Sequence, residues 1–233
     1  MRVFVTGGTK GIGLKIVEKF LKETSAEIHF TGRDQEAGNR ITQMDSRLKF
    51  HCIDTAQRDE IPKLYSLVGP VDVLILNAGI CKDTLFLRMK DEDFDAVVKT
   101  NLYSPFWITK AFISDMLKKQ SGSIIYLSSV SARGNAGQAN YAASKAGLEG
   151  MAKSLALEIG KRNVRVNVVR PGFTDTKMTQ DLPDSLKQEI MKHIPLSRMA
   201  QPEEIAEVVY HLAMNFSYVN GQVVTVDGGL TLH

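Results

Sequence analysis

The chain has 233 residues, 43% of them apolar, and a formal net charge of +3, which suits one sizeable core and excludes the basic surface of a nucleic-acid-binding protein. Its two cysteines lack metal-ligand spacing, no apolar run is long enough to span a bilayer, and an apolar strand begins at residue 2 where a signal peptide would stand. We therefore expect a single cytoplasmic domain over residues 1–233, with no metal, no membrane partner and no nucleic-acid partner.

Short strand-like runs alternate with longer helical patterns. In chain order the pattern predicts a strand at residues 3–6, a helix at 11–23, a strand at 28–31, a helix at 35–44, a strand at 48–53, a helix at 61–67, a strand at 71–76, one long helix or a broken pair at 92–119, a strand at 123–127, a helix at 139–160, a strand at 164–169, a polar segment at 174–198, a helix at 202–214 and a strand at 223–226. Two of these strands, 71–76 and 164–169, are almost continuously apolar, as expected where both faces of a parallel sheet are covered. We expect a Rossmann-type α/β fold, a doubly wound parallel sheet with helices on both faces, whose ligands bind beyond the carboxyl ends of the strands.

The loop between the first strand and the first helix is rich in glycine. Its spacing is Gly-x-x-x-Gly-x-Gly, not the Gly-x-Gly-x-x-Gly of the commoner dinucleotide fingerprint. Glycines allow a tight turn and a close approach of the backbone to a pyrophosphate, while the helix N-terminus supplies N–H donors. Glycines also mark plain turns, but the place of this loop favours a bound dinucleotide, with contacts from Gly7, Thr9, Lys10, Gly11, Ile12 and Gly13.

The end of the second strand indicates which nicotinamide cofactor would bind. A carboxylate there binds a ribose 2′-hydroxyl and repels a 2′-phosphate, but this chain has Arg33 in that place and Asp34 one residue later. Arginine pairs with phosphate through two hydrogen bonds, and Lys10 could add a second cation. We therefore expect NADPH rather than NADH, the alternative being that Arg33 is a solvated surface residue.

Two further strand ends carry candidate cofactor contacts. Asp54, after the third strand, would bind the adenine amine or else cap the next helix. Asn77, Ala78 and Gly79 follow the fourth strand. There Asn77 can bond backbone groups and Gly79 lets a cofactor pass close by, although a simple turn explains the tripeptide equally well.

Tyr141 and Lys145 stand one turn apart in a predicted helix and so share one face. A tyrosine in water holds its proton to about pH 10. A lysine cation beside it favours the phenolate, so we expect a lowered pKa and a usable general acid or base. By itself the spacing also fits two ordinary surface residues.

Taken together, these residues resemble the short-chain dehydrogenase/reductase family of the classical type. The match covers essentially the whole chain and rests on motifs in the family's order: the glycine loop, residues 77–79, Asn101, a serine before Tyr141, Tyr141-x-x-x-Lys145 and Pro171-Gly172. Other stretches look like the bacterial-type 3-oxoacyl-[acyl-carrier-protein] reductases, although family members of other specificity share them: 79–89, 137–141, 166–173 and 221–229.

The resemblance implies a role for each residue of the site. Tyr141 would donate a proton to the substrate oxygen while hydride arrives at the carbonyl carbon, and a serine would hydrogen-bond that oxygen. Lys145 would hold the ribose hydroxyls. Asn101 would hold a water that links Lys145 to solvent, although an asparagine in a helix is also an ordinary packing residue. The remaining cofactor contacts would be Pro171, Gly172 and Thr176, the last touching the nicotinamide carboxamide or capping the helix that follows.

Two serines compete for the catalytic role. Counting thirteen residues back from Tyr141, the family's usual spacing, gives Ser128, whereas aligning residues 123–129 as a strand that runs into its loop gives Ser129. Adjacent residues of a strand point to opposite faces, so the register decides between them, and we prefer Ser129. Tyr126 stands where the family often has asparagine, a difference that the sequence does not explain.

The segment at 174–198 lies where the family carries a mobile substrate lid. Its apolar residues would line an acyl groove or pack a short helical pair: Leu182, Leu186, Ile190, Ile194 and Leu196. We expect an NADPH-dependent reductase of a 3-oxoacyl thioester on acyl carrier protein, in fatty-acid or related synthesis. The alternatives are a reductase of another ketone or alcohol and, from a different class, a non-catalytic protein that senses NADPH. The family is commonly tetrameric, so a homotetramer is expected.

Overall fold

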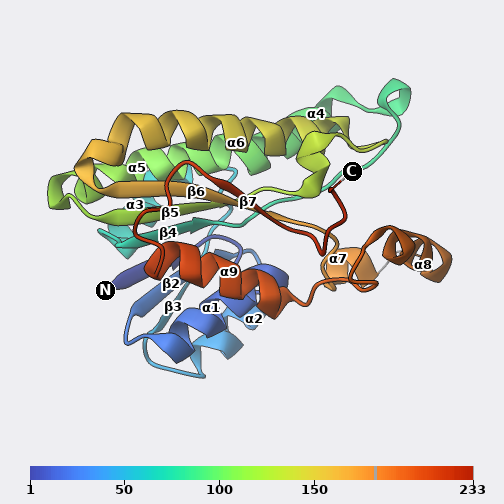
Figure 1. The fold of residues 1–233 in the computed structure, drawn as a ribbon. Helices are drawn as coiled ribbons and strands as arrows, with labels where there is room; N and C mark the ends of the chain where they lie inside the picture. Colours follow the sequence, from blue (N-terminus) through green and yellow to red (C-terminus); the bar gives the residue numbers. More distant parts are fainter. Residues whose placement is uncertain (181–182, 233) are drawn as a thin grey trace.

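Seven parallel strands form one sheet in the order β3-β2-β1-β4-β5-β6-β7 (Figure 1). The structure, a computed structural model, describes residues 1–180 and 183–232. The strands are β1 (Arg2–Val5), β2 (Glu27–Gly32), β3 (Leu48–Cys52), β4 (Val73–Leu76), β5 (Gly122–Leu127), β6 (Val164–Pro171) and β7 (Val223–Val226). The Rossmann-type, doubly wound fold expected from the alternating pattern is confirmed.

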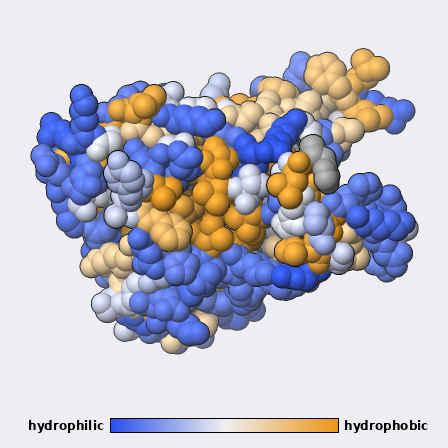
Figure 2. Space-filling view, in the orientation of Figure 1, coloured by the Kyte–Doolittle hydropathy of each residue, from blue (hydrophilic) through white to orange (hydrophobic). Residues whose placement is uncertain are grey.

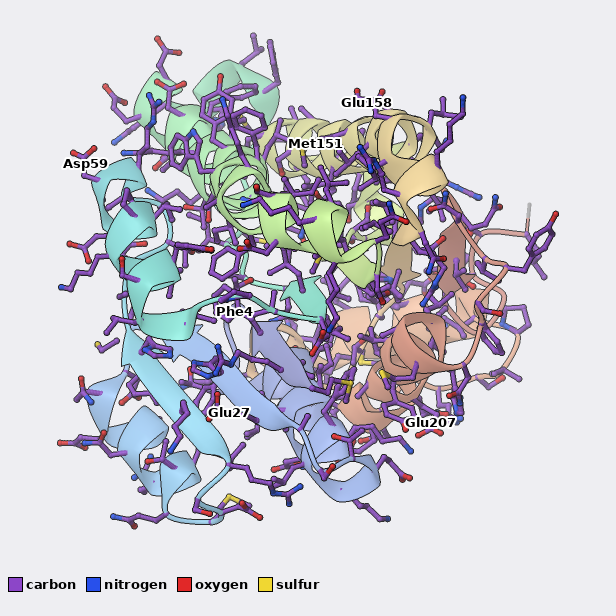
Figure 3. All side chains as sticks on the ribbon, turned by 90° about the vertical axis from the view of Figure 1, so that its left-hand side faces the viewer. Phe4, Glu27, Asp59, Met151, Glu158 and Glu207 are labelled. Atoms are coloured by element: carbon purple, nitrogen blue, oxygen red, sulfur yellow. The ribbon has the colours of Figure 1, made fainter. Side chains whose placement is uncertain are left out.

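Helices cover both faces of the sheet. They are α1 (Gly11–Glu23), α2 (Gln35–Thr42), α3 (Ile61–Val68), α4 (Asp91–Val98), α5 (Ser104–Lys119), α6 (Ala139–Ile159), α7 (Lys177–Gln180), α8 (Asp184–His193) and α9 (Pro202–Met214). Apolar stripes of α1, α2 and α9 pack on one face of the sheet, and those of α3, α5 and α6 pack on the other. Phe4, labelled in Figure 3, belongs to the second core, where its ring centroid lies 5.2 Å from that of Phe112.

The order in which successive strands are added to the sheet reverses at β1. This strand pairs with β2 on one side and with β4 on the other. The loops that follow β1 and β4 therefore meet at the carboxyl edge of the sheet. The Thr6 hydroxyl accepts hydrogen bonds from the backbone N–H groups of Asn77 and Ala78, each at 3.0 Å. This switch point is where open α/β sheets bind their ligands.

The segment predicted as one long helix or a broken pair is a continuous helix with a π-helical turn in its middle. The turn covers Lys99–Tyr103, between α4 and α5, and contains Asn101. Pro105 has no N–H to give to the carbonyl of residue 101, four places earlier, so regular α-helical hydrogen bonding fails there. The irregular turn thus has a cause in the sequence.

Two features of the surface bear on how the chain could meet other molecules. Figure 2 shows apolar side chains gathered over β7, the edge strand, whose four residues Val223–Val226 are only half-buried. Helices α7 and α8 project from the body beside this edge. Within residues 1–180 and 183–232, every helix is too short or too polar to cross a membrane.

Candidate functional site

The glycine loop after β1 is shaped so tightly that side chains would not fit. Gly7 and Gly11 have φ angles of +69° and +54°, in the left-handed region that favours glycine. A Cβ atom at Gly13 would lie 2.1 Å from the carbonyl oxygen of Gly7, and one at Gly8 would lie 2.7 Å from Cβ of Phe30. The loop is thus a bare backbone cradle, which fits a bound pyrophosphate.

Helix α1 begins at Gly11 and directs its first N–H groups toward this cradle. Its N-cap residue is Lys10, whose ammonium group has only donors and so cannot satisfy those N–H groups. The first turn contains no acidic residue. Both facts leave the positive end of the helix dipole available to an anion, so the residues present fit a dinucleotide phosphate.

Asn77 braces the cradle from the neighbouring strand. Its side-chain Nδ2 donates to the carbonyl oxygens of Thr6 at 3.0 Å and Gly7 at 3.1 Å. This is the bonding to backbone groups expected of Asn77. The following residues Ala78 and Gly79 run directly beside the loop, since a Cβ on Gly7 would lie 3.0 Å from Cα of Ala78.

The two candidate 2′-phosphate cations follow residues that touch each other. Thr9 packs on Gly32, where a Cβ atom would lie 2.5 Å from Cγ2 of Thr9. Lys10 and Arg33 come next on their respective strand ends, and both are exposed. Asp34 is occupied elsewhere, because its carboxylate caps α2 by accepting from the N–H of Ala37 at 2.9 Å.

Asp54 lies at the end of β3 on the same edge. Its Oδ1 accepts from the backbone N–H of Ala56 at 3.0 Å, which shapes the turn that follows. Cys52 places this strand end beside the cations, since its thiol donates to the carbonyl oxygen of Arg33 at 3.8 Å. The adenine contact of Asp54 stays a prediction.

Tyr141, Lys145 and Asn101 come together at the carboxyl ends of β4 and β5. Lys145 is 3% exposed and Asn101 is fully buried. The Lys145 ammonium donates to the carbonyl oxygen of Leu127 at 2.7 Å and lies 5.5 Å from the centre of the Tyr141 ring. A Cβ on Gly79 would lie 3.2 Å from Oδ1 of Asn101 and 3.5 Å from Nζ of Lys145, so the backbone after β4 passes between them.

Both polar atoms of the Asn101 side chain form hydrogen bonds. Its Oδ1 accepts from the N–H of Ile80 at 2.9 Å, and its Nδ2 donates to the Ile80 carbonyl at 3.0 Å and to the Ser144 hydroxyl at 3.2 Å. Asn101 therefore clamps the segment after β4 onto the face of α6. Its expected role as the holder of a water stays a prediction.

The structure turns the two candidate serines to opposite sides. Ser128 is buried, and its hydroxyl donates to Glu149 Oε1 at 2.6 Å. Ser129 is extended, with φ −161° and ψ 154°, and a hydrogen bond between its hydroxyl and Tyr141 acts to lower the tyrosine's pKa. Ser129 is thus the serine beside the candidate acid, which favours it for the proposed role.

The expected lowering of the Tyr141 pKa by Lys145 is wrong for this geometry. Burial raises the pKa of Tyr141 well above its ordinary value, Cys81 raises it further, and the bond to Ser129 only partly opposes this. The Lys145 ammonium lies over the ring and donates a hydrogen bond to the Leu127 carbonyl oxygen. Burial also lowers the pKa of Lys145 itself, to about 8.

Sequence reasoning missed three residues that support this cluster. Cys81 shares a hydrogen bond with Tyr141, and burial raises the pKa of its thiol to about 11. Asn140 is buried and donates to the carbonyl of Lys82 at 2.9 Å, while Ser144 donates to the carbonyl of Tyr141 at 2.7 Å. Cys81 lies in the loop after β4, and Asn140 and Ser144 lie at the polar start of α6, positions that gave no distinct signal in the sequence. Tyr126, left unexplained above, is a core residue whose hydroxyl pairs with that of Thr109 at 2.7 Å.

The segment after β6 closes the other side of the cradle. Gly172 follows Pro171 and packs so closely that a Cβ would lie 2.7 Å from Cα of Asp227. Thr176 reaches the glycine loop, since its Cγ2 lies 3.6 Å from where a Cβ of Gly11 would stand. Its carbonyl also accepts from the N–H of Thr179 at 2.9 Å at the start of α7.

The apolar residues of the predicted lid divide between the two roles considered for them. Ile194 is 2% exposed and packs as a core residue against Gly228. Leu186 and Leu196 are exposed, at 44% and 64%, and Ile190 is half-buried. Leu182 lies outside the described residues. Core packing and an accessible apolar surface therefore coexist in this segment.

Comparison with known proteins finds relatives along nearly the whole chain. A family model described as enoyl-(acyl carrier protein) reductase matches residues 7–231. The 3-oxoacyl-[acyl-carrier-protein] reductase of Chlamydia muridarum is 43% identical over 237 residues, covering 97% of this chain and 95% of that protein. The protein of the same name from Escherichia coli is 40% identical over 233 residues, covering 97% and 95%. A solved structure described as a short chain dehydrogenase/reductase family protein has a TM-score of 0.92 at 33% identity and covers 99% of this chain and 97% of that chain.

Proposed function

The chain belongs to the short-chain dehydrogenase/reductase family, and from this premise we propose that it reduces a 3-oxoacyl thioester on acyl carrier protein to the 3-hydroxyacyl form with NADPH. Two relatives that it matches over nearly their whole length carry the name of that activity. The proposal places the chain in fatty-acid or related synthesis.

One arrangement carries the proposal: the Ser129 hydroxyl lies close enough to the Tyr141 phenol to act on its pKa, and both lie beside the buried Lys145. A substrate carbonyl oxygen placed between the two hydroxyls would receive a hydrogen bond from Ser129 as negative charge develops on it. Tyr141 would then donate its proton to that oxygen. Burial raises the pKa of Tyr141, so the residue carries this proton at neutral pH but releases it less readily than a tyrosine in water.

The cofactor would supply the hydride, and this chain's residues would orient it. The backbone of Gly7 and Gly11 and the N-terminus of α1 would hold the pyrophosphate. Arg33, with Lys10, would hold the 2′-phosphate. Lys145 would hold the ribose hydroxyls, and Thr176, beside the glycine loop, would contact the carboxamide.

The description of the matching family model names a different reduction, that of an enoyl thioester. There hydride adds to one carbon of the C=C bond and a proton ends on the other, so the product carries no new hydroxyl group. The Tyr141–Ser129 pair is arranged for an oxygen, so we favour the 3-oxo substrate. A ketone without a thioester would suit the same pair and is the second candidate.

A substrate screen tests the proposal. The purified chain is mixed with NADPH and, in turn, acetoacetyl and crotonyl thioesters of acyl carrier protein and of coenzyme A, and a panel of simple ketones. We expect NADPH oxidation with the acetoacetyl thioesters only. Turnover of crotonyl thioesters alone would assign enoyl reduction, and turnover of other ketones alone would assign the second candidate.

We also propose that the chain works as a single domain in a homotetramer, with residues 174–198 as its substrate lid. Two exposed apolar surfaces support assembly: the strip over β7 (Figure 2) and the turn Phe86–Arg88, where Leu87 is 98% exposed. Sedimentation equilibrium should give a single species of four times the chain mass of 25.8 kDa. A monomer at assay concentration would contradict this assembly.

A further inference from the structure

Helix α6 carries a third ionisable residue on the face that holds Tyr141 and Lys145. Glu149 follows Lys145 by four residues, so the three side chains lie in one row along the helix. Glu149 is only 8% exposed. Burying a carboxylate costs free energy unless the group is paired and hydrogen-bonded, so the partners of Glu149 decide what it does here.

Two side chains from two strands satisfy this carboxylate. Arg170 of β6 donates from Nε to Glu149 Oε1 at 2.8 Å and from a terminal nitrogen to Oε2, a two-bond pairing. Ser128, at the end of β5, donates to the same Oε1 at 2.6 Å. Burial opposes ionisation, but the bonds from Arg170 and Ser128 keep the pKa of Glu149 below its ordinary value.

The network fixes the last residues of β5, which are the ones that form the site. Leu127 presents its carbonyl to Lys145, Ser128 is bonded to Glu149, and Ser129 follows. Because the backbone is extended here, a Ser128 side chain turned to Glu149 turns Ser129 the opposite way, toward Tyr141. Arg170 also donates to the Thr225 hydroxyl at 3.3 Å, which ties β7 to the same group.

We propose that Glu149 is a positioning residue for the reduction: held by Arg170, it accepts a hydrogen bond from the Ser128 hydroxyl and so fixes the orientation of the chain just after β5, which presents Ser129 to the substrate oxygen. The role rests on the proposed function. Its essential element is the acceptor for Ser128, whereas the negative charge serves to neutralise Arg170. The two contributions can be separated by mutation.

Three variants separate position from charge. Glu149→Gln keeps an oxygen for Ser128 but leaves Arg170 without a counter-charge, so Tm should fall by roughly 5 °C or more while kcat stays within about 3-fold of wild type. Glu149→Leu combined with Arg170→Leu removes both charges, so Tm should largely recover, but kcat should fall by about 10- to 100-fold because Ser129 is no longer held in place. Ser128→Ala should lower kcat by a similar factor. In all three variants the KM for NADPH should change little, since the glycine cradle is built by other strands.

Arg165→Leu is the matched control. Arg165 lies on the same strand as Arg170, is also partly buried, and donates to the carbonyls of Leu212 and Ala213 at the end of α9. Its loss should lower Tm and leave kcat unchanged, because these bonds lie far from Ser129 along the strand. All rates are measured at a temperature where circular dichroism shows each variant fully folded.

The positioning role predicts that Tm and kcat rank the variants in opposite orders: Glu149→Gln has the lower Tm and the higher kcat, and the double leucine variant has the reverse. If kcat follows Tm, so that Glu149→Gln is the slowest variant, or if every folded variant keeps the wild-type kcat, the positioning role is overturned. Wild-type turnover of acetoacetyl thioester is measured in the same assay. An inactive wild type would refute the proposed function and this role with it, whereas an active wild type with unaffected variants would refute the role of Glu149 alone.

Discussion

The Lys145 ammonium lies 5.5 Å from the centre of the Tyr141 ring and donates a hydrogen bond to the Leu127 carbonyl oxygen at 2.7 Å. The lysine thus faces the π surface of the tyrosine and is anchored to the end of β5. In this arrangement burial dominates both residues, raising the pKa of one and lowering that of the other. Tyr141 therefore carries its proton at neutral pH in this arrangement.

Tyr141→Phe should abolish most of the turnover without weakening cofactor binding. Loss of a general acid typically lowers kcat by about 10²- to 10⁴-fold, while the Kd for NADPH, followed by its fluorescence, should stay within a small factor. Tyr126→Phe is the control: it removes a buried hydroxyl bonded to Thr109 and should cost about 1–3 kcal/mol of stability with kcat unchanged. A Tyr141→Phe enzyme with wild-type kcat would mean that another group donates the proton.

Ser129→Ala should lower kcat by about 10²- to 10³-fold, the usual effect of removing one donor to a developing oxyanion. The KM for the acyl substrate should rise less, because the hydrogen bond strengthens only as charge develops. Steady-state rates with acetoacetyl thioester measure both. Ser66→Ala, at an exposed hydroxyl that bonds Pro62 within α3, serves as the control. Equal kcat in the two variants would remove Ser129 from the mechanism.

Arg33→Ala should discriminate between the two nicotinamide cofactors. A charge-assisted bond contributes roughly 1.5–3 kcal/mol, so the Kd for NADPH should rise by about 10- to 100-fold while that for NADH changes little. Titration calorimetry with both dinucleotides measures the difference. The matched control is Arg40→Ala, at an exposed arginine near the end of α2. Equal weakening of both cofactors would contradict a 2′-phosphate contact.

Lys145→Met should change how stability depends on pH. Burial lowers the pKa of Lys145 from 10.5 to about 8, so between these values the unfolded chain binds more protons than the folded one. Wild-type stability therefore rises with pH across that window, and the penalty for burying the cation is fully present below pH 8. Relative to wild type, the methionine variant should be most favoured at pH 7 and lose that advantage as pH approaches 10.5.

Denaturant unfolding at a series of pH values tests this expectation. The variant also leaves the Leu127 carbonyl without its donor, so the change with pH, and not the absolute difference, is diagnostic. Lys153→Met, at an exposed position of the same helix, is the control for the loss of a lysine side chain. A pH-independent difference for Lys145→Met would show that its cation carries no burial penalty. The Lys145→Met enzyme should also be inactive.

Most of the fold follows from periodicity. Helices α1 and α9 have the predicted bounds, and the strands differ by at most two residues at either end, because apolar spacing and glycine or proline boundaries act locally. The π turn at Lys99–Tyr103 was not predicted, although Pro105 indicates it. A proline inside a predicted helix leaves the carbonyl four residues earlier without its N–H donor. Applied to Pro105, this rule would have predicted an irregular turn around residue 101.

Motifs were enough to name the candidate site residues, but not to predict their pKa shifts or their hydrogen-bond partners. The choice of serine depends on how the chain leaves β5, which the contact of Ser128 with Glu149 and the place of Ser129 beside Tyr141 reveal. The direction of the Tyr141 pKa shift depends on burial, which no spacing encodes. Glu149 itself looked like an ordinary helical glutamate, because its partner Arg170 is distant in the sequence.

Because of the π turn, the number of residues in helix 91–119 determines how the parts of the site are oriented. A π turn is an α-helical turn with one residue added, so deleting a single residue from Lys99–Tyr103 would join α4 and α5 into one regular helix. Each residue of an α-helix turns the chain by about 100°, and the deletion would swing everything before it by that angle, including the segment that Asn101 clamps at Ile80. The shortened chain would have a more regular helix and a dismantled site.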